Sequence, residues 1–176
     1  MMDILDLIES RASYRGAYAE TPVPREHLDA ILRAGCAAPS GCNKQTTSFI
    51  AVDEPALLDE LKAIVMPRIG DTAPAWILVL PRPIVAYRDR VFNVQDYSAA
   101  IENMLLEIKA LGYESCWYEG HVTDDDDLGG QLARRLGVPE EYRLVCVLPV
   151  GVPAEPVKRV RKLPVEERVW YNGFGK

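Results

Sequence analysis

Apolar residues recur at helical spacing in several segments of the chain. The most regular segment is 96–111, where Ile101, Met104 and Ile108 share one face and Gly112 follows as a helix-ending residue. This segment should form the central helix. The same spacing predicts shorter amphipathic helices at 3–10, 24–35, 55–66 and 123–136.

Four other apolar stretches lie between turn-forming residues and are predicted to form strands. They are at 47–52, 75–80, 113–118 and 142–150, and the run at 75–80 is apolar throughout, as in a fully buried strand. Pro67 should end the helix before it, because proline disfavours helical backbone in the preceding residue. Helices and strands alternate with no convincing linker or internal repeat, so 1–176 is expected to be one domain.

Beyond Gly151 the periodic pattern stops. Three prolines, Pro153, Pro156 and Pro164, flank a basic run at 158–162, and the chain then carries Val169, Trp170, Tyr171 and Phe174. Such a segment cannot bury its own aromatic side chains. We therefore expect 151–176 to be an extended arm that docks on the body or on a second subunit.

Composition narrows the class of protein. With 48% hydrophobic and 26% charged residues the chain resembles an ordinary globular domain, and a formal net charge of -6 argues against a general nucleic-acid-binding surface. No apolar run approaches the roughly 20 residues of a membrane span, and Asp3 and Asp6 make the amino terminus acidic, unlike a signal peptide. We expect a cytoplasmic protein without membrane contact.

Metal and disulfide chemistry is not indicated. The four cysteines form no C-x-x-C pair and, with only two histidines, no zinc-ligand spacing, so they are interpreted as reduced thiols without a redox role. The acidic run 124–127 lacks the glycine and glutamate spacing of an EF-hand. It is interpreted as charge at a helix N-terminus, with Thr123 or Asp124 as the cap.

Three short polar segments could bind a ligand. Two arginines and a serine in 11–15 suit a phosphate, whereas the small and amide-bearing residues of 38–45 would let a backbone approach a flat polar molecule. The segment 116–120 ends a predicted strand with a glycine. Each also has an ordinary explanation, as a solvated stretch, a helix-to-strand turn or a strand exit.

In combination, these segments and the basic tail resemble the nitroreductase family of FMN-dependent oxidoreductases along nearly the whole chain. The resemblance implies an α+β fold in which helices cover a mostly antiparallel central sheet. It also implies an intertwined homodimer, with C-terminal arms exchanged between subunits and FMN bound at their interface. The domain 1–176 would then be a single FMN-binding unit.

The resemblance also assigns candidate FMN-binding residues. Those implied near the phosphate and ribityl chain are Arg11, Ala12, Ser13, Arg15, Arg159 and Arg161. Those implied along the isoalloxazine ring, often from the opposite subunit, are Pro39, Ser40, Asn43 and Gln45. A further turn, whose backbone N–H groups would point toward flavin N5 and O4, comprises Tyr118, Glu119 and Gly120.

The chain departs from the family pattern at three places. Gly41 and Cys42 replace a more usual hydroxyl or small residue, and Gln45 is not followed by the common Pro-Trp. The stretch 67–95 is short, so the sequence does not show which residues cover the substrate pocket. Its residues that could touch substrate, or be solvated loop residues, are Tyr87, Arg88, Arg90 and Phe92.

The reaction implied is ping-pong transfer of hydride from NADH or NADPH through flavin N5 to an electron-poor acceptor such as a nitroarene or quinone. The flavin would carry the chemistry, so no catalytic side chain is predicted. Two alternatives stay open: a protein that stores or senses FMN, and a related flavin reaction such as dehalogenation or flavin fragmentation.

Overall fold

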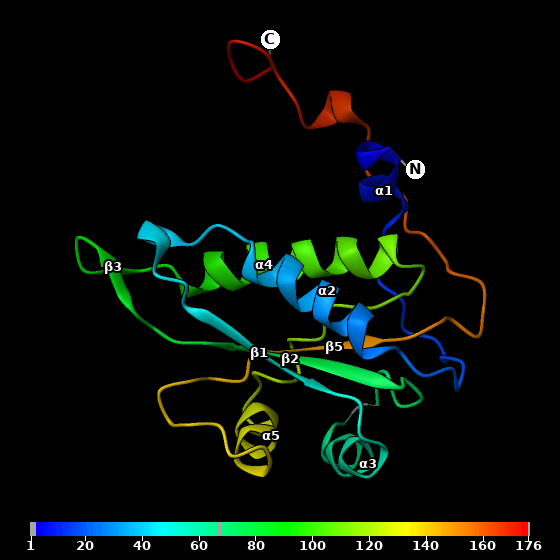
Figure 1. Ribbon diagram of the computed structural model, residues 1–176. Helices are drawn as coiled ribbons and strands as arrows, with labels where there is room; N and C mark the ends of the chain where they lie inside the picture. Colours follow the sequence, from blue (N-terminus) through cyan, green and yellow to red (C-terminus); the bar gives the residue numbers. More distant parts are fainter. Residues whose placement is uncertain (1–2, 67, 176) are drawn as a thin grey trace.

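A three-stranded antiparallel sheet forms the centre of the protein in the computed structural model, which describes residues 3–66 and 68–175 (Figure 1). Its strands are β1 (Thr47–Val52), β2 (Ala75–Pro81) and β5 (Cys146–Val150), with β2 in the middle. Every residue of β2 is buried, as its unbroken apolar sequence predicts.

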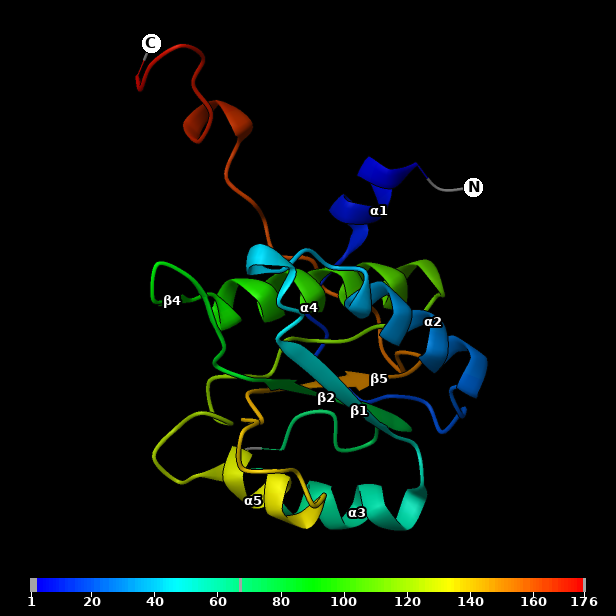
Figure 2. The ribbon, with the colours of Figure 1, turned by 60° about the vertical axis from the view of Figure 1, so that its left-hand side comes forward.

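Helices cover both faces of this sheet (Figures 1 and 2). One face lies under α2 (Arg25–Cys36) and α4 (Asn93–Ala110), and the other lies against α3 (Pro55–Ile64) and α5 (Leu128–Arg135). This arrangement confirms the α+β fold with an antiparallel sheet.

The alternation of side chains along β2 divides the core in two. Ile77 and Val79 pack with the α4 residues Ile101 and Met104, whereas Trp76 and its alternate neighbours pack on the α3 and α5 side. The expected central helix is confirmed, since Ile101 and Met104 are completely buried. It begins at Asn93, three residues before the predicted start.

Local capping sets where two of the predicted helices begin. Asp3 accepts a hydrogen bond from the backbone N–H of Ile4 and starts α1 (Ile4–Ser10). Glu54 accepts from the N–H groups of Ala56 and Leu57 and starts α3. The expected role of Pro67 in ending α3 lies outside the described residues.

Two predicted elements are wrong in type or extent. The segment 113–118 is not a strand, because it makes only isolated bridges, such as Ser115 with Ser13 and Tyr118 with Val147. Its apolar residues are buried between neighbouring segments, but the segment does not form a β-ladder with them. The strand predicted at 142–150 begins only at Cys146, since Tyr142 closes a turn onto Pro139.

The helix expected from Thr123 or Asp124 begins later, at Leu128. The residues before it form successive turns, in which Thr123 N–H donates to Glu119 O and Asp127 N–H donates to Asp124 O. Asp127 occupies the N-cap position with φ of 56° but makes no side-chain cap, and its carboxylate binds Arg134 instead. The predicted caps are therefore wrong.

Short irregular elements escaped prediction. A hairpin of β3 (Val85–Tyr87) and β4 (Arg90–Val91) precedes α4, and single 3-10 turns form η1 (Gly41–Asn43) and η2 (Val165–Glu167). Strands of two or three residues are too short for a hydrophobic period to identify.

The aromatic end of the C-terminal arm projects away from the body of its own subunit (Figures 1 and 2), whereas the start of the arm packs on that body: Ala154 N–H donates to Ala17 O, and Val157 packs against the core. Tyr171 and Phe174 are 80% and 85% exposed, and the rings of Trp170 and Phe174 contact each other at 4.1 Å between centroids. Docking on its own body, one of the two expected outcomes, is therefore wrong for this aromatic end but holds for the start of the arm. No helix within 3–66 or 68–175 is long and apolar enough to cross a membrane.

Candidate functional site

The segment 11–15 runs extended beside residue 115 and presents alternate side chains outward. Tyr14 N–H donates to Ser115 O at 2.8 Å, which fixes the segment against the body. Ala12 and Tyr14 are buried, whereas Ser13 and Arg15 are exposed. An extended backbone thus places the hydroxyl and the guanidinium on one face.

Arg11 differs from these neighbours because its guanidinium is mostly covered. Its side chain is 21% exposed, and Nε lies 3.3 Å from a carboxylate oxygen of Glu102 on α4. That nitrogen is buried, and the contact does not have the geometry of a hydrogen bond. A buried donor left in this state is what an anionic ligand would satisfy.

A cavity of about 230 Å³ adjoins this segment where the arm begins. Its lining includes Ser13, Arg15 and Lys158, two of them cationic, together with Glu155. Lys158 had not been singled out by sequence. Arg159 and Arg161 follow it on the arm as exposed side chains, and neither belongs to this lining.

The loop 39–45 is built around Ser40. Gln45 N–H donates to Ser40 Oγ at 2.9 Å, and Asn43 N–H donates to Ser40 O at 2.9 Å. The loop holds Cys42, Asn43 and Gln45 at φ of 50°, 53° and 49°, which only asparagine among these residue types adopts readily. Pro39, Asn43 and Gln45 are exposed, so the strained loop presents them to a ligand or a partner.

Asp96 fastens this loop to the first turn of α4. Its Oδ1 accepts from Gly41 N–H at 2.8 Å and its Oδ2 accepts from Thr46 Oγ1 at 2.7 Å. Asp96 is 5% exposed, and a carboxylate so buried needs such donors. A side chain at position 41 would meet the Phe92 ring at 2.8 Å, which explains the glycine there.

The turn at 117–120 is fastened by the next residue of α4. Glu119 Oε1 accepts from Tyr97 Oη at 2.6 Å, and its Oε2 accepts from Trp117 Nε1 at 2.6 Å. Burial, and then the bond to Glu119, raise the pKa of Tyr97 well above its usual range, so Tyr97 stays a donor. Tyr118 pairs through its backbone with Val147, and Gly120 is exposed.

One helical turn therefore anchors two of the three expected segments. Sequence reasoning missed Asp96 and Tyr97, because it treated Asp96 as the start of a helix and did not assign Tyr97. An acid followed by an aromatic residue at that place was the only available signal, and it is ambiguous without the fold.

Two of the four cysteines lie within the candidate segments, Cys42 in the loop 39–45 and Cys116 at the start of 116–120. All four are free thiols, with Cys116 and Cys146 buried and Cys36 and Cys42 exposed. Burial raises the pKa of the Cys116 thiol to about 11, which keeps it protonated at neutral pH. A buried, protonated thiol is a poor nucleophile.

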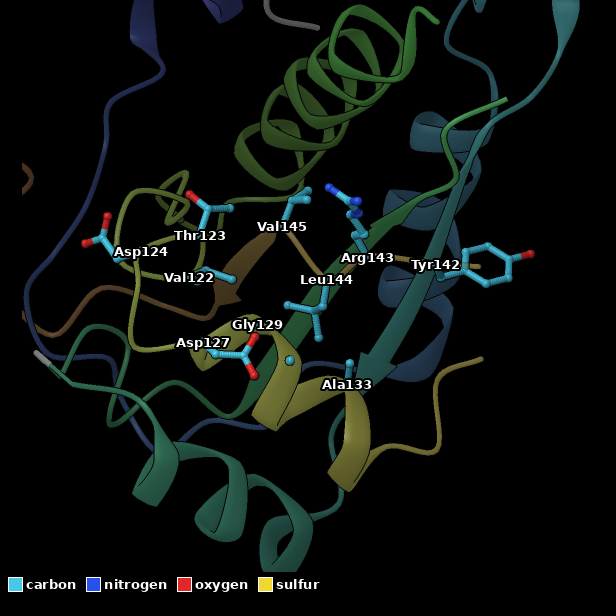
Figure 3. A pocket seen from close by; sticks show the side chains of 11 residues that line it. Val122, Thr123, Asp124, Asp127, Gly129, Ala133, Tyr142, Arg143, Leu144 and Val145 are labelled. Carbon is cyan, nitrogen blue, oxygen red and sulfur yellow. The ribbon is translucent and has the colours of Figure 1, made fainter. Parts of the chain in front are cut away.

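A larger cavity, of about 420 Å³, lies on the other side of the molecule between α5 and the segment 142–145 (Figure 3). Asp124 and Asp127 line one part of it and Arg143 another, as Figure 3 shows, so its lining is not a concentration of positive charge that would favour a phosphate. None of the expected FMN-binding residues borders this cavity. In 3–66 and 68–175 no three side chains form a group that could hold a metal ion.

Comparison with known proteins places this geometry in a family. The family model described as "Nitroreductase family" matches residues 8–69 and 67–152. The chain belongs to the nitroreductase family. A relative from Archaeoglobus fulgidus, provisionally named an NADH dehydrogenase/NAD(P)H nitroreductase, is 31% identical over 156 residues, which is 88% of each chain.

A solved nitroreductase shows the same architecture with a flavin present. The structure from Bacteroides fragilis, described as a nitroreductase with bound FMN, has a TM-score of 0.79 and 28% identity. The alignment covers 98% of this chain and 100% of that one.

A more distant relative of the chain is named for another reaction. Iodotyrosine deiodinase 1 of Rattus norvegicus is 24% identical over 179 residues, covering 86% of this chain and 62% of the deiodinase. Membership in the family therefore leaves the electron acceptor open.

Proposed function

We propose that this protein binds FMN and transfers hydride from NADH or NADPH, through the flavin, to an electron-poor acceptor such as a nitroarene or quinone. The observation that carries the proposal is the pair Asp96 and Tyr97. These adjacent residues hold the two segments that would border the isoalloxazine ring, and both are fully engaged by protein donors and acceptors. Such a site is organised before any ligand arrives.

The residues near 11–15 fit a phosphate. The buried Nε of Arg11 lacks a hydrogen bond, and Ser13, Arg15 and Lys158 add a hydroxyl and two cations around one cavity. A phosphate dianion takes several charge-assisted hydrogen bonds, preferably from arginine. Arg159 and Arg161 would contribute more positive charge from the arm.

The remaining candidates would meet the ring. Pro39, Ser40, Asn43 and Gln45 come from the loop that Asp96 holds, and Glu119 and Gly120 would offer backbone N–H groups. Because Tyr97 and Trp117 occupy the Glu119 carboxylate, that side chain positions the turn and does not transfer a proton. When bound, FMN supplies a reversible hydride acceptor at N5.

A second copy of the chain would complete the site. The cavities at Ser13 and at the loop 39–45 measure about 230 and 80 Å³, and pockets that enclose a cofactor usually measure several hundred. Apolar side chains also lie exposed at both ends of the described chain: Ile4, Leu5, Ile8, Val169, Tyr171 and Phe174. A homodimer with exchanged arms would cover them.

The test is a spectrum followed by anaerobic reduction. The purified protein should be yellow, and NADH or NADPH should bleach the oxidised-flavin absorbance within seconds. An FMN protein that neither nucleotide bleaches would favour the storage or sensing role. The deiodinase relatives support one further experiment, in which the reduced protein is mixed with 3-iodotyrosine and iodide release is measured.

A further inference from the structure

The β3–β4 hairpin presents an aromatic ring beside two arginines. Tyr87 is 51% exposed, and strand register places it directly opposite Arg90, so the two side chains share a face. The guanidinium carbon of Arg88 lies 5.1 Å from the Tyr87 ring centroid. Val85 and Val91 extend the exposed apolar surface along the hairpin.

The tip of the hairpin is held in an unfavourable conformation. Arg88 and Asp89 have φ of 45° and 62°, whereas two-residue turns of this hand are usually made by asparagine and glycine. An arginine is not a residue that such a turn requires. Strain kept at an exposed side chain is a feature of ligand-binding positions.

The hairpin borders the candidate ring-lining loop. Strand β3 packs beside η1. The chain leaving β4 passes directly into Phe92, whose ring would lie 2.8 Å from a Cβ at position 41. Whichever subunit supplies the loop 39–45 to a flavin therefore supplies the hairpin with it. A molecule stacked on that flavin would meet Tyr87 and its arginines.

The charge of this segment is opposite to that of the chain. The protein has a formal net charge of -6, yet the hairpin and its flanks contain Arg82, Arg88 and Arg90 against the single acid Asp89. Arg82 is engaged elsewhere, with its guanidinium 4.9 Å from the Tyr142 ring centroid. Arg88 and Arg90 are the cations that an incoming molecule would meet.

We propose that this hairpin selects flat aromatic acceptors that carry an anionic group such as a carboxylate. The ring of the acceptor packs against Tyr87, and its anionic group binds Arg88 and Arg90. This inference rests on the proposed function, because it assigns the substrate class at the same flavin site. The proposal also assigns part of the wall of the substrate pocket to this hairpin, in a chain whose 67–95 stretch is short.

The experiment compares 4-nitrobenzoate with the neutral 4-nitrobenzamide. The FMN-loaded protein is photoreduced without oxygen, so no nicotinamide is needed, and each compound's second-order rate of flavin reoxidation is measured. The native protein should favour the benzoate, and the double variant Arg88→Gln/Arg90→Gln should lose about tenfold of that preference. Flavin absorbance measures FMN occupancy in each preparation.

The matched control removes the same charge on the far side of the sheet. Arg134→Gln/Arg135→Gln breaks exposed ion pairs with Asp127 and Glu60 on α5 and α3, and it should leave the preference unchanged. A third variant, Tyr87→Leu, should slow reoxidation by both compounds, because both lose the aromatic surface.

Several outcomes would overturn the inference. Equal rates for the two compounds in the native protein, or an unchanged ratio in the hairpin variant, would each do so. So would a variant impaired only in reduction by NADH or NADPH, since the arginines would then bind the dinucleotide. If neither nucleotide reduces the flavin but the preference persists after photoreduction, the proposed NAD(P)H activity fails while this inference stands. A protein that takes up no FMN overturns both.

Discussion

The first turn of α4 and the C-terminal arm are both expected to border FMN, yet they differ in what holds them. In the first turn, Asp96 and Tyr97 are buried and each makes side-chain hydrogen bonds within its own chain. In the arm, Tyr171 and Phe174 are exposed and pack on nothing in the body. The segments proposed to border the ring are thus organised within one chain, whereas under the proposed homodimer the aromatic end of the arm would be covered only by a second copy.

The largest expected effect comes from removing the arm. Deleting residues 169–176 should lower dimer stability and FMN occupancy together, because the aromatic side chains would no longer be buried against a second subunit. We expect FMN affinity to fall on the order of 100-fold, because that factor corresponds to about 2.7 kcal/mol, roughly the free energy of burying one aromatic side chain. Sedimentation and flavin absorbance measure the two effects. A full-length monomer near 19.6 kDa that retains FMN at micromolar concentration would contradict the shared site.

Loss of the buried guanidinium should come next. Arg11→Ala should weaken FMN binding by about 1.5–3 kcal/mol, the usual contribution of a charge-assisted hydrogen bond. The same variant should bind riboflavin as the native protein does, because riboflavin has no phosphate. Titration calorimetry with both ligands checks this, and equal native affinities for FMN and riboflavin would refute the phosphate assignment.

The contacts that Asp96 makes from α4 can be weakened by a substitution that keeps the shape of the side chain. Asp96→Asn can still accept from Gly41 N–H, but its amide then faces Thr46 Oγ, whose hydroxyl must turn to accept, and both bonds lose the negative charge that strengthened them. We expect about 1–3 kcal/mol less stability in urea denaturation, with weaker FMN binding. Asp71→Asn, at an exposed ion pair with Arg68, is the control and should cost little. If FMN affinity is unchanged while stability falls, Asp96 does not position the loop.

The smallest effect is expected within the loop itself. Cys42 is exposed and lies beside the candidate ring-lining residues. Cys42→Ser should leave turnover within about tenfold, because the flavin would be the only redox centre. Steady-state rates with a nitroarene measure this, and complete loss of turnover in a variant that still binds FMN would give the thiol a part in the reaction.

Hydrophobic periodicity predicted the helices and strands that bury one continuous face, and it failed for segments that do not bury such a face. The strand at 75–80 and the helix at 96–111 were recognised, since their apolar positions follow the geometry of the element. The segment 113–118 is also largely buried, although it contains Glu114 and Ser115, but it makes only isolated bridges to residues far away in sequence. Whether an extended segment joins a ladder depends on those distant partners.

The sequence by itself determined the single most regular helix, the buried strand at 75–80 and the order of motifs that resembles the nitroreductase family, because these depend on local spacing and residue type; the α+β class followed from that resemblance. Only the tertiary structure decided that Asp96 and Tyr97 hold two candidate segments, that Lys158 joins Ser13 and Arg15 at one cavity, and that the aromatic end of the arm leaves its own body. Those features are contacts between residues distant in the chain. A hydrogen bond that spans 55 residues, such as Gly41 to Asp96, leaves no periodic trace in either segment.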